Sequence, residues 1–274
     1  MKSLKFILAG AVTLLVILIV VSNTVETTGP SSVRRSSAAD DGQLKIGVLD
    51  SAPVYYTDPD GSKAKGFDYE IALGVTESIG IKPSFIPMDF ADLFTALDEG
   101  EIDMIASQVS VTEEREEAYD FSHPYFVTYL SFTTPKNSPI RKLKDINGTR
   151  VAIVDGTAQE SILKARFPKA QIVKRKNEAA ALEAVAAGKA DSFFYDAPFT
   201  EGLIKNAPIP MEERIVFPSD KAPIAFVFRK DDGLRDQADD AIDEMIVNGT
   251  WLRIKTDYFR EYPLSELFRE QGVE

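Results

Sequence analysis

Three residues of types that could together bind a zwitterion are Arg115, Thr157 and Asp196. The segment Ser110-Val111-Thr112-Glu113 has the pattern of a helix capping box, which predicts that Arg115 lies in the first turn of a helix. The helix dipole disfavours a cation at that place, so Arg115 is better explained if it faces an anion. The alternative is a surface arginine that pairs with one of the acidic residues beside it, which are Glu113, Glu116 and Glu117.

Thr157 and Asp196 stand at the expected starts of two further helices. Thr157 follows Gly156, and the free N–H groups of a helix start bind carboxylate or phosphate groups. Asp196 ends an expected strand and precedes Ala197-Pro198, a good helix beginning. The alternative for each residue is a plain N-cap. If the three side chains converge, one cation, one helix start and one carboxylate match an amino acid.

Composition excludes several other classes of protein. The chain has 274 residues with 31 Lys+Arg and 43 Asp+Glu, for a net charge of -12, which argues against nucleic-acid binding. It has no Cys and one His, which excludes disulfides, thiol nucleophiles and thiolate or His-rich metal sites. The acidic run from Asp231 to Glu244 lacks EF-hand spacing and is interpreted as a solvated helix face. We therefore expect no metal and no cofactor.

The elements that must position these residues form two similar α/β units. Short apolar runs alternate with helical stripes, which predicts a mainly parallel sheet in each unit. The expected strands of the first unit are 44–49, 82–86 and 102–106 with helices 67–79 and 90–97, and those of the second are 150–154, 171–174 and 190–195 with helices 157–167 and 179–187. Ligands of such sheets lie beyond the carboxyl ends of the strands, so Ser107, Gln108 and Asp196 are the positions to inspect.

The first 42 residues are expected to target the chain rather than to fold with it. Lys2 and Lys5 precede an apolar run over 6–21, slightly shorter than the ~20 residues of a spanning helix. We interpret 1–22 as a signal peptide or an uncleaved membrane anchor, and the Ser- and Thr-rich segment 23–42 as a flexible tether. The protein is then periplasmic or otherwise extracytoplasmic, either secreted or anchored.

Five segments in order resemble the bacterial extracellular solute-binding proteins of family 3, which are the amino-acid-binding components of ABC importers. They are GFDYEIA (66–72), SVTEER (110–115), DFSHPY (120–125), VAIVDGT (151–157) and NGTW (248–251). The resemblance extends from Leu44 to Phe259 and implies a type II periplasmic-binding-protein fold, with two α/β lobes and a closing cleft. Two crossover strands, near 129–134 and 224–228, would divide the chain into lobe 1 (43–128 and 225–274) and lobe 2 (129–224).

The resemblance also implies roles for individual residues. Arg115 would bind the α-carboxylate of the ligand, with Thr157 and Ser110 completing that site, and Asp196 would accept from the α-ammonium together with the backbone carbonyl of Gln108. The first loop departs from the family pattern, because Ser51 or Ala52 replaces an aromatic residue that stacks on the ligand. Tyr55 and Tyr56 are the candidates to supply that ring.

We therefore expect a monomeric binding protein that captures an α-amino acid by cleft closure and delivers it to the membrane permease of an ABC importer, without bond chemistry. Two alternatives use the same fold. One is an enzyme like the periplasmic dehydratases that resemble this family, for which Glu160 and His123 are candidate acid–base residues. The other is a ligand-sensing module tethered to the membrane.

Overall fold

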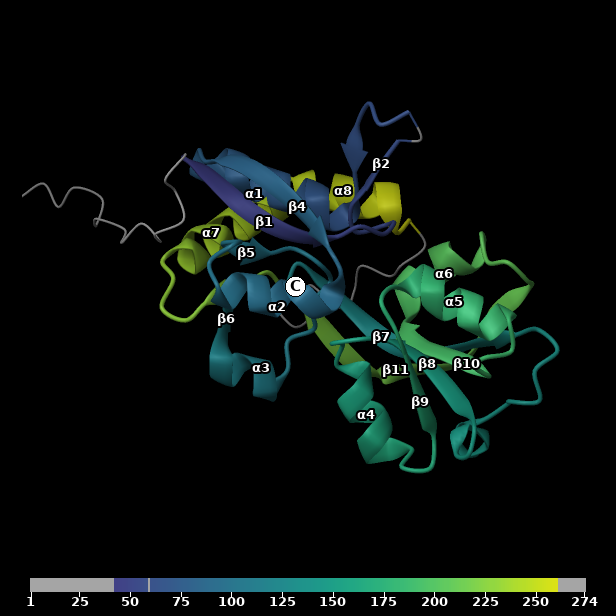
Figure 1. Ribbon diagram of the computed structural model, residues 1–274. Helices are drawn as coiled ribbons and strands as arrows, with labels where there is room; N and C mark the ends of the chain where they lie inside the picture. The colour runs from purple at the N-terminus through teal and green to yellow at the C-terminus, as the bar shows by residue number, and fades with distance from the viewer. Residues whose placement is uncertain (1–41, 59, 261–274) are drawn as a thin grey trace, which may run out of the picture. The chain divides into compact units, whose positions relative to one another are not determined.

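The computed structural model describes residues 42–58 and 60–260, which form two five-stranded sheets with helices around them (Figure 1). The expectations for 1–22 and for most of 23–42 lie outside these residues. The first sheet has the order β4-β1-β5-β12-β6 and the second the order β11-β7-β10-β8-β9. A small hairpin pairs β2 (Tyr56–Thr57) with β3 (Ala64–Lys65).

The first sheet collects strands from both ends of the described chain. Its members are β1 (Gln43–Leu49), β4 (Lys82–Met88), β5 (Met104–Ile105), β6 (Tyr119–Phe121) and β12 (Val227–Arg229). β1 pairs in parallel with β4 and β5, whereas β12 is antiparallel to both β5 and β6. The parallel arrangement places the carboxyl ends of β1 and β5 at one edge, where the segment Ser107–Gln108 follows.

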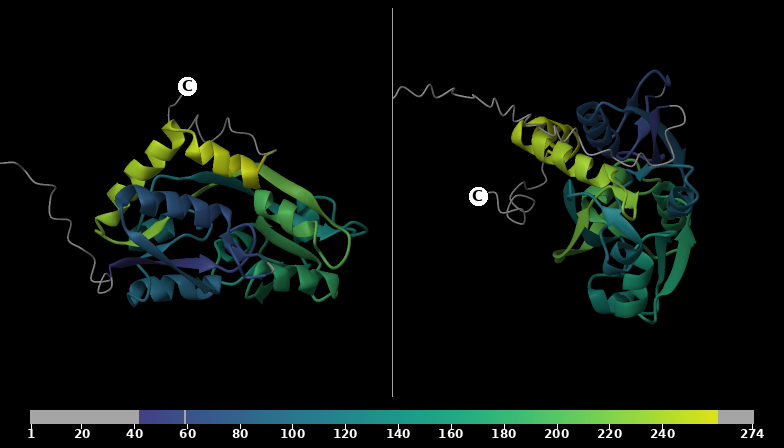
Figure 2. Two further views of the ribbon diagram at one scale, coloured as in Figure 1. Left: turned by 90° about the horizontal axis from the view of Figure 1, so that it is seen from above. Right: turned by 90° about the vertical axis from the view of Figure 1, so that its left-hand side faces the viewer.

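Four longer helices pack on or beside this sheet: α1 (Phe67–Ile79), α2 (Phe90–Asp98), α7 (Leu234–Val247) and α8 (Thr250–Tyr258). Helix α1 buries its apolar stripe and ends at Gly80, whose φ of 71° closes the helix in the left-handed conformation. Helices α7 and α8 lie against α1, so the end of the described chain completes the unit that its beginning starts (Figure 2). The acidic run predicted to be a helix face falls largely on α7.

The second sheet consists of β7 (Phe126–Pro135), β8 (Arg150–Val154), β9 (Gln171–Arg175), β10 (Ser192–Asp196) and β11 (Met211–Ile224). β8 pairs in parallel with β9 and β10, and β7 pairs antiparallel with β10 and β11. Helices α4 (Gln159–Arg166), α5 (Glu178–Ala186) and α6 (Ala197–Ile204) and the 3₁₀ turn η1 (Leu143–Ile146) belong to this unit. Its parallel strands end just before Gly156, just before Asn177 and at Asp196.

The chain passes from the first sheet to the second in β7 and returns at the junction of β11 and β12. The two crossovers expected near 129–134 and 224–228 fall on these segments. The predicted alternation of strands and helices is confirmed in type and order, with boundaries that differ by a few residues. None of the described helices is long and apolar enough to cross a membrane.

Candidate functional site

Five of the nine residues predicted to bind ligand line one small cavity, which lies between the unit of the first sheet and the unit of the second sheet. They are Gln108, Ser110, Arg115, Thr157 and Asp196. The cavity also has four lining residues that the sequence did not single out, which are Phe90, Ala158, Gln159 and Tyr195. Its volume is about 10 Å³, roughly enough for one water molecule.

Arg115 turns its guanidinium toward this cavity. It lies in α3 (Glu113–Ala118), where its Nη1 donates to the Ser110 carbonyl at 2.9 Å and its Nη2 to the Gly156 carbonyl at 3.2 Å. The guanidinium carbon stands 5.0 Å from the Phe94 ring centre. Among the described residues no ion pair links Arg115 to the neighbouring glutamates, so the cation faces Gly156 of the other unit instead. Burial lowers the pKa of Arg115 to about 10, although the charge of Asp196 opposes that shift.

The capping box predicted at Ser110 is wrong. The residue that caps α3 is Thr112, whose Oγ1 accepts from the backbone N–H of Arg115 at 3.3 Å. Ser110 instead forms an isolated β-bridge with Ile224, at the end of β11. The bridge holds the segment before α3 against the returning crossover, which fixes the position of the carbonyl that Arg115 contacts.

Asp196 lies at the end of β10 and is 3% exposed. It occupies the N-cap position of α6, but its side chain makes no capping hydrogen bond. Its Oδ2 accepts from Gln159 Nε2 at 2.8 Å, and its Oδ1 has no hydrogen-bond partner within the described part of the chain. Burial raises the pKa of Asp196 to about 7, while the Gln159 hydrogen bond and the Arg115 charge work against the rise. A buried acceptor is thus left facing a cation-lined cavity.

Gln108 and Thr157 present polar groups from the two sides. Gln108 has φ of 52°, a left-handed conformation that is uncommon for a residue other than glycine, and neither Oε1 nor Nε2 of its side chain has a partner within residues 42–58 and 60–260. Its backbone N–H donates to Asp68 Oδ1 at 2.8 Å. Thr157 is not the N-cap of α4, since Ala158 holds that position and Thr157 Oγ1 donates to the Val154 carbonyl at 2.7 Å.

The other four predicted residues lie outside the cavity lining. Ser107 is buried, and its Oγ accepts from the Leu49 N–H at 2.6 Å, which ties β1 to the segment after β5. The Tyr55 ring packs on Tyr69 and Phe85 with centres 5.7 and 6.1 Å apart. Tyr56 belongs to the β2–β3 hairpin, and Ser51 lies in the loop that follows β1.

The sequence did not point to two polar residues that line the cavity, Tyr195 and Gln159. Tyr195 precedes Asp196 on β10, and its hydroxyl donates to Glu178 Oε1 at 2.9 Å. Gln159 comes two residues after Thr157 and donates to Asp196. Tyr195 is next to Asp196 and Gln159 is close to Thr157 in the sequence, and this proximity was the one signal that could have indicated them.

The two acid–base candidates are engaged elsewhere. Glu160 forms ion pairs with Lys164 and Lys174 at 2.7 Å each, and its hydrogen bond from Lys164, followed by that from Lys174, lowers its pKa. His123 contacts Asp243, with 3.3 Å between Nδ1 and Oδ1, and its backbone N–H donates to Asp239. Neither residue lines the small cavity, although Glu160 lines the open groove beside it. Among the described residues no group of three His, Asp or Glu side chains could hold a metal ion.

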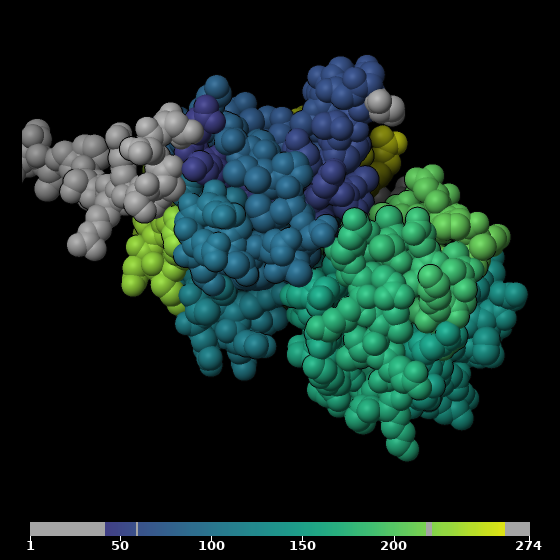
Figure 3. All heavy atoms as spheres, viewed as in Figure 1, coloured from purple at the N-terminus to yellow at the C-terminus, as the bar shows by residue number. Residues whose placement is uncertain are grey.

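An open groove of about 550 Å³ adjoins the small cavity and shares Arg115, Thr157 and Ala158 with it. It runs between α3 and α4, and Figure 3 shows the corresponding hollow between the blue and the green atoms below the centre of the view. The shared residues make this groove the outer side of the same site.

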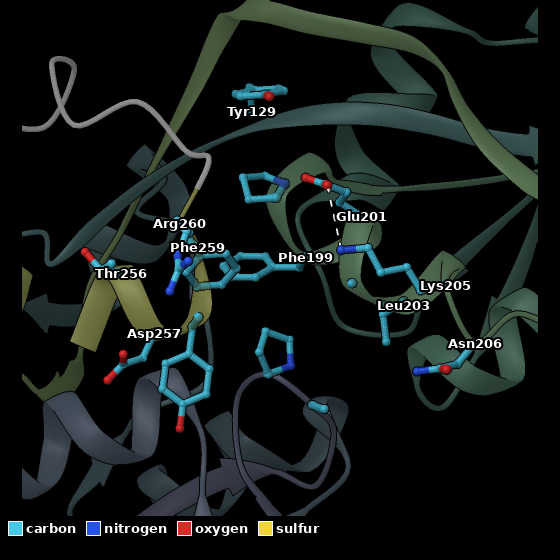
Figure 4. A pocket seen from close by; sticks show the side chains of 15 residues that line it. Tyr129, Phe199, Glu201, Leu203, Lys205, Asn206, Thr256, Asp257, Phe259 and Arg260 are labelled. Atoms are coloured by element: carbon cyan, nitrogen blue, oxygen red, sulfur yellow. Dashed lines mark ion pairs between the residues drawn. The ribbon is translucent and has the colours of Figure 1, made fainter. Parts of the chain in front are cut away.

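A second cavity of about 540 Å³ lies between α6, the end of α8 and the first loop (Figure 4). Pro53, Tyr129, Phe199 and Phe259 give it an aromatic and apolar wall, and the Glu201–Lys205 pair stands at one side. None of the residues predicted to bind ligand lines it.

Comparison with known proteins gives a consistent result. Residues 44–261 match the bacterial extracellular solute-binding proteins, family 3. The probable amino-acid-binding protein YxeM of Bacillus subtilis is 31% identical over 82% of this chain and 87% of its own length, and the arginine-binding extracellular protein ArtP of the same organism is 29% identical over 89% and 97%. The solved structure of an ancestral arginine-binding protein bound to arginine is 28% identical, with a TM-score of 0.75 over 80% of this chain and 98% of that one.

Proposed function

Because this chain belongs to the bacterial extracellular solute-binding proteins of family 3, we propose that Arg115 and Asp196 bind the two charged ends of an α-amino acid in a closing cleft. The two-lobe α/β fold is the type II periplasmic-binding fold of amino-acid-binding proteins. The chain is an amino-acid-binding protein of an ABC transporter and not an enzyme.

Arg115 is the group that binds the α-carboxylate. Its guanidinium already donates to two carbonyl oxygens, Ser110 O and Gly156 O, and a carboxylate could replace these neutral acceptors with a stronger one. Thr157 and the start of α4 stand on the opposite wall of the same cavity. A ligand carboxylate placed there would contact a cation from one unit and a helix start from the other.

The free Oδ1 of Asp196 is the single observation that carries the proposal. A buried carboxylate oxygen without a partner is unfavourable in a folded protein and is expected where a ligand supplies the missing group. The ligand must bring a donor and, best, a positive charge. An α-ammonium group does both, and Gln108 adds unpaired polar atoms beside it.

The cavity size requires the cleft to open. At about 10 Å³ it is far below the ~300–1,000 Å³ of small-molecule sites, so an amino acid enters only when the two units separate. We assign these moving units to 43–128 with 225–274, of which 261–274 lie outside the described residues, and to 129–224. The crossovers in β7 and at the β11–β12 junction form the hinge. The ligand then bridges both units and holds them together.

We also propose where the protein is located and what it delivers its ligand to. Relatives of this chain are extracellular or periplasmic binding proteins. Segment 1–22 acts as a signal or anchor, 23–42 as a tether, and the monomeric protein delivers its ligand to the membrane permease of the importer.

A thermal-shift screen with each of the standard amino acids tests this function. A ligand present at 100 times its dissociation constant should stabilise the folded state by about 2.7 kcal/mol. Recovered ligand should be chemically unchanged. If no amino acid stabilises the protein, or if the ligand is converted to a product, the proposed function is wrong.

A further inference from the structure

One buried carboxyl group lines the cavity, and two others accept hydrogen bonds from residues that line it. Asp68, Glu178 and Asp196 are 0%, 2% and 3% exposed, and each leaves one oxygen without a hydrogen-bond partner among the described residues. Arg115 is the one basic side chain among the lining residues that the structure describes. An α-amino acid brings one ammonium group, which can meet only one of these three carboxyl groups.

Two of the three carboxyl groups have evident roles. Asp68 Oδ1 accepts from the Tyr125 hydroxyl at 2.6 Å and from the Gln108 N–H at 2.8 Å, which holds Gln108 in its left-handed conformation. Asp196 is assigned above to the α-ammonium. Glu178 remains without such a role.

Glu178 lies at the same edge of its sheet as Asp196. It begins α5 directly after β9, and β9 and β10 both run parallel to β8, so their carboxyl ends meet at that edge. Its Oε1 accepts from the hydroxyl of Tyr195, a residue that lines the cavity. Burial raises the pKa of Glu178, and the Ser51 side chain, which comes from the loop after β1 in the other unit, is among the groups that oppose this rise.

Glu178 is thus close to Ser51, one of the two residues that stand where the family pattern has an aromatic ring. A glutamate at a helix start is ordinarily solvated and compensates the helix dipole. Glu178 is instead 2% exposed, and its Oε2 has no hydrogen-bond partner within residues 42–58 and 60–260. Burying a carboxylate without a partner is costly unless a cation or donor meets it.

We propose that the ligand is an amino acid with a cationic side chain, of the arginine or lysine class, and that Glu178 is the specificity-determining residue that meets the side-chain charge. The inference rests on the proposed function, since the α-carboxylate at Arg115 and the α-ammonium at Asp196 orient the ligand. Asp196 and Tyr195 are neighbours on β10, and Glu178 lies beyond the Tyr195 hydroxyl. A long side chain that passes Tyr195 brings its terminal cation to Glu178 Oε2.

Calorimetric titration of the wild-type protein with arginine and with citrulline tests the inference directly. Citrulline keeps the length and shape of arginine and lacks its positive charge, so the pair isolates the side-chain charge. Arginine or lysine should bind roughly 30-fold or more tightly than citrulline or glutamine, as expected for a buried charge pair. Equal or weaker binding of the cationic ligands overturns the inference and leaves the proposed function standing.

The variant Glu178→Gln assigns that preference to a residue. The amide keeps the size of the side chain and removes its charge, so arginine should lose affinity while citrulline changes little. Glu213→Gln is a matched control, because Glu213 is a partly buried carboxylate bonded by the Ser131 and Thr200 hydroxyls away from the cavity. It should retain the full preference for arginine.

Two further outcomes separate the possible failures. If Glu178→Gln weakens the binding of arginine and of citrulline equally, Glu178 does not distinguish ligands by their side-chain charge, which overturns the inference. If the wild-type protein binds none of the amino acids, the proposed function itself fails. The comparison of arginine with citrulline uses only the wild-type protein, so it tests the preference for a cationic side chain even if Glu178→Gln does not fold.

Discussion

Replacing Asp196 by Asn should stabilise the ligand-free protein at high pH while it impairs binding. Burial raises the pKa of Asp196 from 3.8 to about 7. For an acid whose pKa is raised by folding, the associated stability is fully present below the unfolded-state pKa and is lost as the pH rises through the folded-state pKa. Ionised Asp196 therefore weakens the fold most above pH 7.

The pKa shift sets the size of this effect. A rise of about three pKa units corresponds to a loss of roughly 4 kcal/mol at pH 8 relative to strongly acidic pH, of which about 2–3 kcal/mol is lost between pH 5 and pH 8. The Asn amide does not titrate, but it places a donor where no acceptor is available, at a cost of about 1–3 kcal/mol. Asp196→Asn should thus exceed the wild type in stability by roughly 1–3 kcal/mol at pH 8 and lose that advantage at pH 5.

Urea unfolding without ligand, at pH 5 and at pH 8, measures the free energy of unfolding of the wild type and of Asp196→Asn. Asp191→Asn is the control with the opposite sign, because the Arg150 hydrogen bond lowers the pKa of Asp191 and both pH values lie above it. That variant should be less stable than the wild type by a similar amount at each pH. A stability difference between Asp196→Asn and wild type that is the same at pH 5 and pH 8 would refute the titration of Asp196 in this range.

Three further outcomes follow from the site geometry. Arg115→Ala should weaken amino-acid binding by roughly 2–5 kcal/mol in calorimetry, and an unchanged affinity would show that Arg115 does not bind the ligand carboxylate. Gly156→Ala should weaken binding, because the new Cβ would lie 3.0 Å from Ala91 Cα across the closed cleft. Gly148 has a similar left-handed φ but open space around it, so Gly148→Ala should lose stability and keep its affinity for the ligand. Equal affinities of the two glycine variants would contradict closure at Gly156. Small-angle scattering should give a smaller radius of gyration at saturating ligand, and identical profiles would argue against hinge closure.

The sequence predicted the elements because their signals are local. The apolar stripe of α1 and its stop at Gly80 are complete within one segment, and the apolar runs of β1 and β8 show their burial directly. The placement of Arg115, Thr157 and Asp196 at element ends also followed from local patterns. Parallel strands then brought those ends to one cavity.

Contacts between distant segments could not be predicted from the sequence, because no local pattern specifies them. Ser110 and Thr112 both carry hydroxyls suitable for a cap, and the bridge of Ser110 to Ile224 decided between them. The direction of the Tyr55 ring depends on the cluster with Tyr69 and Phe85.

Glu178 has the sequence appearance of a common helix-start glutamate. Its burial and its bond to Tyr195 arise only from tertiary packing.

The central claim is that Asp196 receives the α-ammonium of an amino acid held by Arg115. Calorimetric titration of wild type and Asp196→Asn, with the tightest-binding amino acid and with its des-amino analogue, tests it most directly. The account predicts that the wild type prefers the amino acid by roughly 2 kcal/mol or more and that Asp196→Asn loses this preference. Equal binding of the two ligands by the wild type would contradict the account.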